Sequence, residues 1–140
     1  MRPGSLSTKL HVHLCETQLV GKIVREFGHW HGVPEEALFL INLSLDELVT
    51  NIVTHSPKQP PGAKEIVLRL STSNGTVSAE IEDDGAEFNP LNLPTPDIGA
   101  PLQDRSPGGL GIHLVRSLMD HVDYRRIGRR NCFTMSKKVA

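Results

Sequence analysis

The sequence predicts an α+β domain in which three helices pack against a sheet of about five strands. In several short segments apolar residues alternate with polar ones, which is typical of strands with one buried face. In other segments they recur every three or four positions, which is typical of amphipathic helices. Asn74-Gly75, a strong hairpin signal, joins two of the alternating segments. We find no repeat or linker, and we expect a single domain over residues 1–140.

The first half of the chain is expected to contain one strand and two helices. Residues 9–14 alternate in polarity and predict a short strand. Residues 18–27 carry apolar side chains at helical spacing, and the Gly28 that follows suits a helix end. A longer helix is expected over residues 34–54, with a proline in its first turn, and Ser56-Pro57 ends it.

The second half of the chain is expected to contain four strands and one helix. The alternating segments that predict the strands are residues 65–71, 76–83, 122–126 and 131–138. The glycine-rich residues 108–111 lead into a helix that we expect to end at about Met119. Between these elements, residues 84–107 contain five prolines and no regular pattern. An irregular segment of that length inside a small domain is typical of a functional lid or of a disordered insert.

Composition and charge argue against several classes of function. The 15 basic and 16 acidic side chains nearly balance, which argues against a dedicated nucleic-acid-binding protein. The balance conceals an acidic segment, residues 1–104, with 7 basic and 14 acidic side chains, and a basic segment, residues 105–140, with 8 and 2. The longest apolar run, residues 37–41, is too short for a membrane span or a secretory signal. Cys15 and Cys132 form no CxxC motif, so we expect free thiols in a cytoplasmic protein.

A row of polar residues follows the predicted long helix. Glu47, Asn51 and His55 are four residues apart, so they fall on one stripe with about 6 Å between successive residues. A carboxylate can act as a general base, an amide oxygen can bind Mg²⁺, and an imidazole can form hydrogen bonds. A polar row on a solvated helix face would show the same spacing, so both interpretations stay open.

An acidic turn, Asp83-Asp84-Gly85, ends one of the predicted strands. A carboxylate at the end of a strand can accept a hydrogen bond from an exocyclic amine such as that of adenine. Gly85 has no Cβ and would let a flat base approach the backbone closely. A turn that only ends a hairpin strand is the simpler interpretation of this pattern alone.

A glycine-rich turn, Gly108-Gly109-Leu110-Gly111, precedes the last predicted helix. Free backbone N–H groups and the positive end of a helix can together bind phosphate. Such turns are also common without a ligand. The sequence contains no P-loop, complete GxGxxG, HRD or DFG motif, which argues against a P-loop NTPase and an ordinary protein kinase.

Taken together and in this order, the three patterns resemble the GHKL ATPase superfamily over about residues 8–138. The stripe from Glu47 to His55 resembles its N-box, Asp83-x-Gly85 its first glycine box, and residues 109–115 its second. The chain is most similar to the stand-alone branch, the anti-sigma regulatory factors, which are bacterial serine/threonine kinases. The resemblance implies a Bergerat-type two-layer α/β sandwich with a mixed sheet. It also implies ATP between the sheet and the helices, under a flexible lid over about residues 84–107.

The resemblance further implies roles for individual residues at an Mg-ATP site. Glu47 would be the catalytic base, and Asn51 would bind Mg²⁺. Asp83 would bind the adenine amino group, and Gly85 would lie close to the base. The residues expected to complete the nucleotide site are His55, Arg105, Gly108, Gly109, Leu110 and Gly111.

The other arginines near the C-terminus have separate expected roles. Arg116, like Arg105, could reach a phosphate. Four arginines surround a predicted turn and are expected to be solvated or to face a partner: Arg125, Arg126, Arg129 and Arg130.

Three functions are compatible with these residues. The leading hypothesis is an ATP-dependent serine/threonine kinase that phosphorylates an anti-anti-sigma (STAS-type) partner and sequesters a sigma factor. The alternative is a nucleotide-sensing module that switches protein partners without phosphoryl transfer, and a third is an interaction domain with a vestigial ATP site. The resemblance implies a homodimer, and we expect neither nucleic acid nor a membrane among the direct partners.

Overall fold

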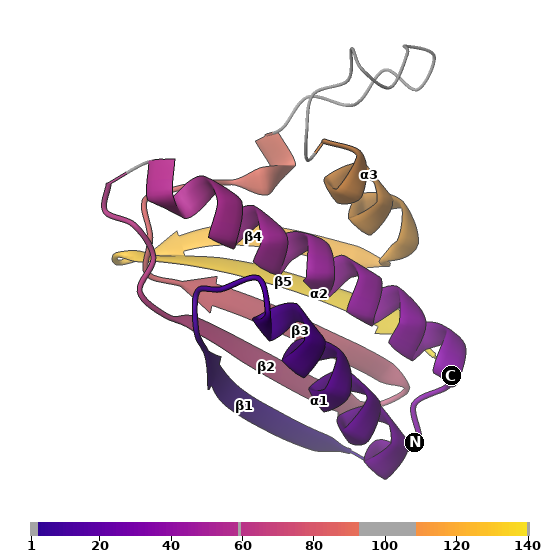
Figure 1. Cartoon of the computed structure of the whole chain (residues 1–140). Helices are drawn as coiled ribbons and strands as arrows, with labels where there is room; N and C mark the ends of the chain where they lie inside the picture. Colours follow the sequence, from indigo (N-terminus) through magenta and orange to yellow (C-terminus); the bar gives the residue numbers. More distant parts are fainter. Residues whose placement is uncertain (1–2, 59, 93–108, 140) are drawn as a thin grey trace.

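The computed structural model describes residues 3–58, 60–92 and 109–139 (Figure 1). The elements in chain order are β1 (Gly4–Leu10), α1 (Glu16–His31), α2 (Glu35–His55), the 3-10 turn η1 (Ser56–Lys58), β2 (Ile66–Ser73), β3 (Thr76–Asp83), the 3-10 turn η2 (Pro90–Asn92), α3 (Gly109–Leu118), β4 (His121–Ile127) and β5 (Arg130–Lys138). These elements confirm the predicted α+β class with three helices and a five-stranded sheet.

The strands are ordered β1-β2-β3-β5-β4, and each neighbouring pair is antiparallel. We expected a mixed sheet, and the structure corrects this detail. Two helices connect β1 to β2. The first leads away from the end of β1 and the second returns to the same end of the sheet, so β2 runs antiparallel to β1. A single helix connects β3 to β4, so these two strands are parallel to each other. They are not neighbours, because β5 lies between them and is antiparallel to both.

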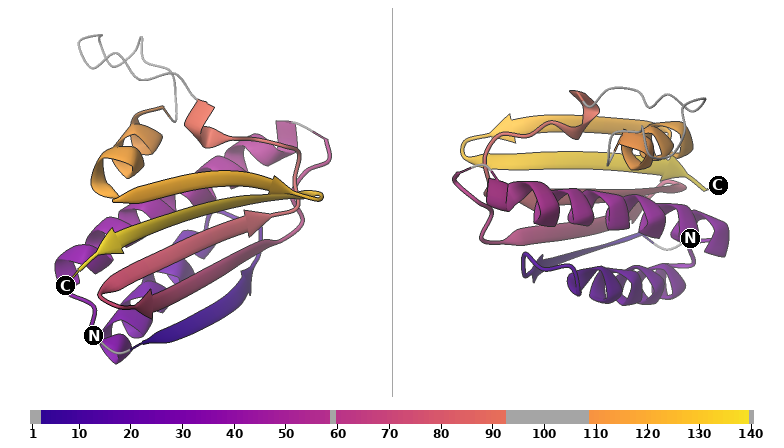
Figure 2. Two further views of the ribbon diagram at one scale, coloured as in Figure 1. Left: turned by 180° about the vertical axis from the view of Figure 1, so that it is seen from behind. Right: turned by 45° about the horizontal axis from the view of Figure 1, so that its top comes forward.

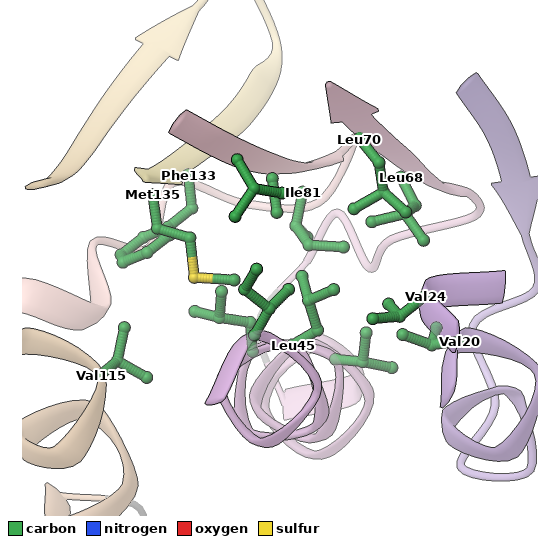
Figure 3. Packing of buried hydrophobic residues seen from close by; sticks show 14 of the residues in the cluster. Val20, Val24, Leu45, Leu68, Leu70, Ile81, Val115, Phe133 and Met135 are labelled. Carbon is green, nitrogen blue, oxygen red and sulfur yellow. The ribbon is translucent and has the colours of Figure 1, made fainter. Parts of the chain in front are cut away.

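The three helices lie on one face of the sheet and form the second layer (Figure 2). The central helix is α2, which contacts α1 and α3 on its two sides. Figure 3 shows Leu45 of α2 packed beneath inward-facing side chains of the central strands, among them Leu68, Ile81 and Met135. Each of these four side chains is at most 2% exposed. The core therefore lies between α2 and the middle of the sheet.

By length and composition alone, α2 could cross a membrane, with a mean hydropathy of 1.4. Its apolar stripe packs instead against the sheet, where Leu38, Ile41, Leu45 and Leu48 are each at most 3% exposed. The core helix of a globular fold passes the same test as a membrane span. We therefore assign the apolar character of α2 to the core.

The first strand lies earlier in the chain than the expected residues 9–14. β1 ends at Leu10, which pairs with Ile66, the first residue of β2, so the chain beyond Leu10 has no partner in β2. The Glu16 carboxylate then accepts a hydrogen bond from the His11 backbone N–H at 2.8 Å. The chain leaves the sheet at this point, although its polarity continues to alternate.

The first helix is longer than predicted, and Gly28 lies inside it. α1 continues to His31, and Gly32 ends it in the left-handed region with φ 74°. A Cβ at position 28 would lie 2.2 Å from a methyl carbon of Leu38. Gly28 therefore allows α1 and α2 to approach closely, and the remaining predicted elements agree with the structure to within two residues.

Three segments that are distant in the sequence meet at one end of the sandwich. Near the end of α2, Asn51 lines the same pocket as Asp83, the last residue of β3. In the first turn of α3, Gly111 contacts Glu47 of α2. Figure 1 shows the end of α2, η2 and the start of α3 on this side of the molecule. Of the expected lid, residues 84–92 are described, and residues 93–107 lie outside the described part.

Candidate nucleotide-binding site

The polar stripe of α2 lies within the fold and is not a solvated helix face. Asn51 is 4% exposed, and Glu47 and His55 are half-buried. The stripe is buried because α2 is the central helix, with α3 along one side and the sheet beneath. Two of its polar atoms, Glu47 Oε1 and Asn51 Nδ2, are buried without a hydrogen-bond partner among the described residues. Such atoms are uncommon in native structures, and a catalytic role or a bound ligand is one explanation for them.

The Glu47 carboxylate lies directly against the first turn of α3. A Cβ added at Gly111 would lie 1.9 Å from Glu47 Cδ, so any larger residue here would displace the carboxylate from its present position. Burial raises the pKa of Glu47 above its usual value, the nearby Asn51 amide opposes the rise, and the negative charge of Asp46 adds to it. The carboxylate therefore has a proton affinity above that of a solvated glutamate.

Asp83 is the last residue of β3 and is 7% exposed. Its Oδ1 accepts hydrogen bonds from the Gly85 backbone N–H at 2.9 Å and from Asn131 Nδ2 at 3.0 Å. No hydrogen bond from the described residues reaches its Oδ2. Burial raises the pKa of Asp83, whereas the two hydrogen bonds and the positive charge of Arg126 oppose the rise. One carboxylate oxygen is thus held in place, and the other is available to an amine donor.

Asn131 of β5 is the residue that orients Asp83, and the sequence analysis did not find it. Its Nδ2 also donates to the Ala86 carbonyl at 2.8 Å. Its Oδ1 accepts hydrogen bonds from the Phe88 backbone N–H at 3.1 Å and from the Tyr124 hydroxyl at 2.5 Å. The only sequence-derived signal that could have identified Asn131 is its position opposite Asp83 in the β3–β5 pair. That position can be recognised only once the order of the strands is known.

A pocket opens beside this network. Its lining residues are Asn51, Ile52, His55, Ser56, Asp83, Gly85, Ala86, Phe88 and Asn131. The rings of His55 and Phe88 stack there, with centroids 5.0 Å apart and planes 25° from parallel. Flat apolar walls with one free carboxylate oxygen suit a planar heterocycle that carries an amino group.

Gly85 lies where the backbone packs tightly at this pocket. A Cβ at position 85 would lie 3.0 Å from Asp83 Oδ1 and 3.2 Å from the Ala63 backbone nitrogen. The absence of a side chain therefore lets the turn after β3 pack against the segment before β2. Close approach of a base to Gly85 remains a prediction.

The glycine-rich segment forms the start of α3, with Gly109, Leu110 and Gly111 as its first three residues. Gly108 and Arg105 lie outside the described residues. Arg116, expected to reach a phosphate, donates from Nη1 to the Leu91 carbonyl at 3.2 Å. In this structure Arg116 connects α3 to η2.

Two of the arginines near the β4–β5 turn are not simply solvated, and this corrects the expectation. Arg126 Nη1 donates to the Gly85 carbonyl at 2.8 Å and to Asn131 Oδ1 at 3.1 Å. Arg130 pairs with Glu65 at 2.5 Å and with Glu82 at 3.1 Å. The basic C-terminal segment therefore pairs Arg130 with two acidic residues of the preceding segment and places the positive charge of Arg126 near Asp83 in the pocket.

The fold and the site together define a class of ATP-binding domain. The model of the histidine kinase-like ATPase domain family matches residues 14–137, and the chain belongs to this family. This match confirms the resemblance to the GHKL ATPases.

The curated relatives of the chain carry kinase names. It is 34% identical over 104 residues to the serine/threonine-protein kinase BtrW of Bordetella bronchiseptica, covering 73% of this chain and 71% of that protein. It is 29% identical over 86 residues to the serine-protein kinase RsbW of Bacillus mycoides, covering 59% and 52%. The match therefore spans about half the length of that RsbW.

Solved structures confirm the fold. A structure of the RsbU and RsbW domains of a Mycobacterium tuberculosis protein superposes with a TM-score of 0.67 at 16% identity, over 96% of this chain and 32% of that one. The blue-light activated histidine kinase of Erythrobacter litoralis superposes with a TM-score of 0.57 at 18% identity, over 88% and 41%.

Proposed function

We propose that this protein is an ATP-dependent serine/threonine protein kinase that phosphorylates an anti-anti-sigma (STAS-type) protein in a bacterial partner-switching system. The observation that carries the proposal is the position of Glu47. It lies one helical turn from Asn51 and against Gly111 at the start of α3. A carboxylate with an unpartnered oxygen among the described residues thus adjoins the segments that resemble the family's nucleotide motifs. The kinase names of the relatives support the same reaction.

In the proposed complex the adenine amino group donates a hydrogen bond to Asp83 Oδ2, because Oδ1 already accepts two. Gly85 lies close to the base. The first backbone N–H groups of α3 have no partner within the helix and suit phosphate oxygens. The other proposed nucleotide ligands are His55, Arg105, Gly108, Gly109, Leu110 and Gly111.

The proposed Mg²⁺ ligand of this chain is the side-chain oxygen of Asn51. The residue fits this role because it is buried and lines the pocket beside Asp83, and an amide oxygen is a ligand that Mg²⁺ accepts. When bound, Mg²⁺ neutralises charge on the phosphates.

The proposed reaction joins the hydroxyl oxygen of the acceptor residue to the terminal phosphorus of ATP, while the bond from that phosphorus to the ADP oxygen breaks. The hydroxyl proton passes to the Glu47 carboxylate. Burial raises the pKa of Glu47, and this brings its proton affinity closer to that needed at neutral pH. Positioning and charge neutralisation contribute most of the rate enhancement, and the base contributes a smaller part.

The biological setting is proposed from the resemblance to the anti-sigma regulatory factors. It comprises the STAS-type partner, the sequestered sigma factor, a cytoplasmic location and a homodimer. A single domain over residues 1–140 with a lid over about residues 84–107 belongs to the same proposal.

Incubation of the purified protein with γ-labelled ATP, Mg²⁺ and each STAS-domain protein of the source genome tests the proposal. We expect label on a serine or threonine of one of these proteins, located by mass spectrometry. Complete absence of labelled product, with ATP binding demonstrated by calorimetry, would exclude the kinase function.

One observation favours the alternative, a nucleotide-sensing module without phosphoryl transfer. Gly111 packs directly on the Glu47 carboxylate, so α3 covers part of the proposed base. The alternative predicts thermal stabilisation by Mg-ATP, since a ligand that binds only the folded state stabilises it. It also predicts ATP-dependent partner binding with no phosphorylated product.

A further inference from the structure

A groove runs along the outer surface between α2 and α3, on the side of Glu47 away from the adenine pocket. Residues of α2 form one wall, among them Leu43, Asp46 and Glu47. Residues of α3 form the other, among them Gly111 and Leu114. The groove shares Glu47 and Gly111 with the proposed active site but none of the residues that line the pocket at Asp83.

The chemistry of the groove changes along its length. Glu47 contacts Gly111, so this end of the groove lies at the start of α3 and carries the two carboxylates of Asp46 and Glu47. One helical turn earlier in α2 lies Leu43, and one turn later in α3 lies Leu114. These leucines are 41% and 40% exposed, so apolar surface faces water close to Glu47. The groove is therefore acidic at one end and apolar about 6 Å away.

We propose that this groove receives the acceptor segment of the protein substrate, with its serine or threonine hydroxyl at Glu47 and an apolar side chain against Leu43 and Leu114. The inference rests on the proposed kinase function. The acceptor hydroxyl donates a hydrogen bond to the Glu47 carboxylate, which lines the groove. The apolar side chain covers the two exposed leucines, whose burial from water is favourable.

The spacing of the groove defines the substrate pattern. The separation of about 6 Å corresponds to residues four apart on a helix, or to residues two apart on the same face of an extended segment. The carboxylates of Asp46 and Glu47 repel acidic side chains next to the acceptor hydroxyl, so neutral or basic neighbours are favoured. The groove thus selects a substrate segment in which an apolar residue lies two or four positions from the acceptor serine or threonine. The residues next to the acceptor are not acidic.

The double variant Leu43→Ser/Leu114→Ser tests the groove. The probe is the STAS-domain protein that the wild-type chain labels most strongly with γ-labelled ATP. We expect KM for this protein to rise about tenfold or more, with ATP affinity unchanged. The matched control is Leu19→Ser on α1, which is 41% exposed and lies outside the groove. Thermal melting of both variants confirms that they are folded.

The outcomes separate this inference from the kinase proposal. Labelling with an unchanged KM in the double variant would overturn the groove and leave the kinase function intact. An equal rise in KM for the Leu19→Ser control would also overturn the inference about the groove, because the effect would not be specific to the groove. If the wild type labels no STAS-domain protein and binds none in calorimetry, both proposals fail. Binding without labelling that the double variant loses would overturn both proposals, because the groove would then hold a partner that is not a substrate.

Discussion

The Asn131 side chain donates a hydrogen bond to Asp83 Oδ1 at 3.0 Å, across the β3–β5 pair in which the two residues are directly opposite. This contact and a second hydrogen bond from Gly85 both engage Oδ1, and no described residue donates to the Oδ2 of this pocket-lining carboxylate. The orientation of the proposed adenine acceptor therefore depends on a strand 48 residues further along the chain.

Asp83→Asn is expected to weaken ATP binding by about tenfold or more without unfolding the protein. The asparagine oxygen can still accept from Gly85 and Asn131, but its amino group now opposes the adenine amino group, donor against donor. Inosine triphosphate carries a carbonyl oxygen at that ring position, so its affinity should fall less than that of ATP. Calorimetric titrations with both nucleotides measure the difference, and an equal loss for the two would argue against the assigned contact.

Asn131→Ala is expected to lower the free energy of unfolding by about 1–3 kcal/mol, because it removes hydrogen bonds from one buried partner and two half-buried ones. The affected groups are the Asp83 carboxylate, the Phe88 N–H and the Tyr124 hydroxyl. Thr134→Ala, at an exposed position of the same strand, is the matched control and should change stability by less than about 0.5 kcal/mol. Denaturant titrations measure both, and similar small effects would show that the network is dispensable.

Gly111→Ala is expected to reduce phosphoryl transfer strongly while the protein stays folded. The new methyl group would meet the Glu47 carboxylate, which can move because it ends a flexible side chain, so the base is displaced. Gly21→Ala in α1 is the control. Its Cβ would meet only the Asn42 side chain at 3.4 Å, and alanine favours helix by about 1 kcal/mol over glycine. Unchanged transfer by Gly111→Ala would mean that the glycine has no role at the base.

The raised pKa of Glu47 predicts a pH-dependent stability difference between the wild type and Glu47→Gln. Burial disfavours the ionised form in the folded state, so the wild type loses stability as pH rises from the usual value of 4.5 through the raised pKa. Glutamine has nearly the same shape and no charge. The melting temperature of Glu47→Gln should therefore exceed that of the wild type at neutral pH, and the two should converge below about pH 4. A constant difference across this range would contradict the raised pKa.

The local elements could be predicted because their signals are local. The apolar stripe of α2 and the Asn74-Gly75 hairpin each lie within one continuous segment, and both appear in the structure. β1 was misplaced because polarity alternates beyond Leu10, where the partner strand ends. The role of Gly28 was missed because its neighbour Leu38 belongs to another helix.

The site was predictable only in part, because some of its residues come together only through contacts between distant segments. The three motifs contain Glu47, Asn51 and Asp83, which the fold brings to one end of the sandwich. Asn131 and Arg126 complete the network around Asp83 but lie on β5 and β4. Their contribution depends on the insertion of β5 between β3 and β4, and no local pattern in the sequence reveals that order.

Single-turnover transfer of labelled phosphate by Glu47→Gln, at saturating Mg-ATP and with the STAS-domain protein that the wild type phosphorylates, tests the central claim most directly. The substitution preserves the volume beside Gly111 and removes the negative charge together with the capacity to accept a proton. We expect the transfer rate to fall about a hundredfold or more, with the affinity for Mg-ATP unchanged. Equal rates for the two proteins would contradict the assignment of Glu47 as the base.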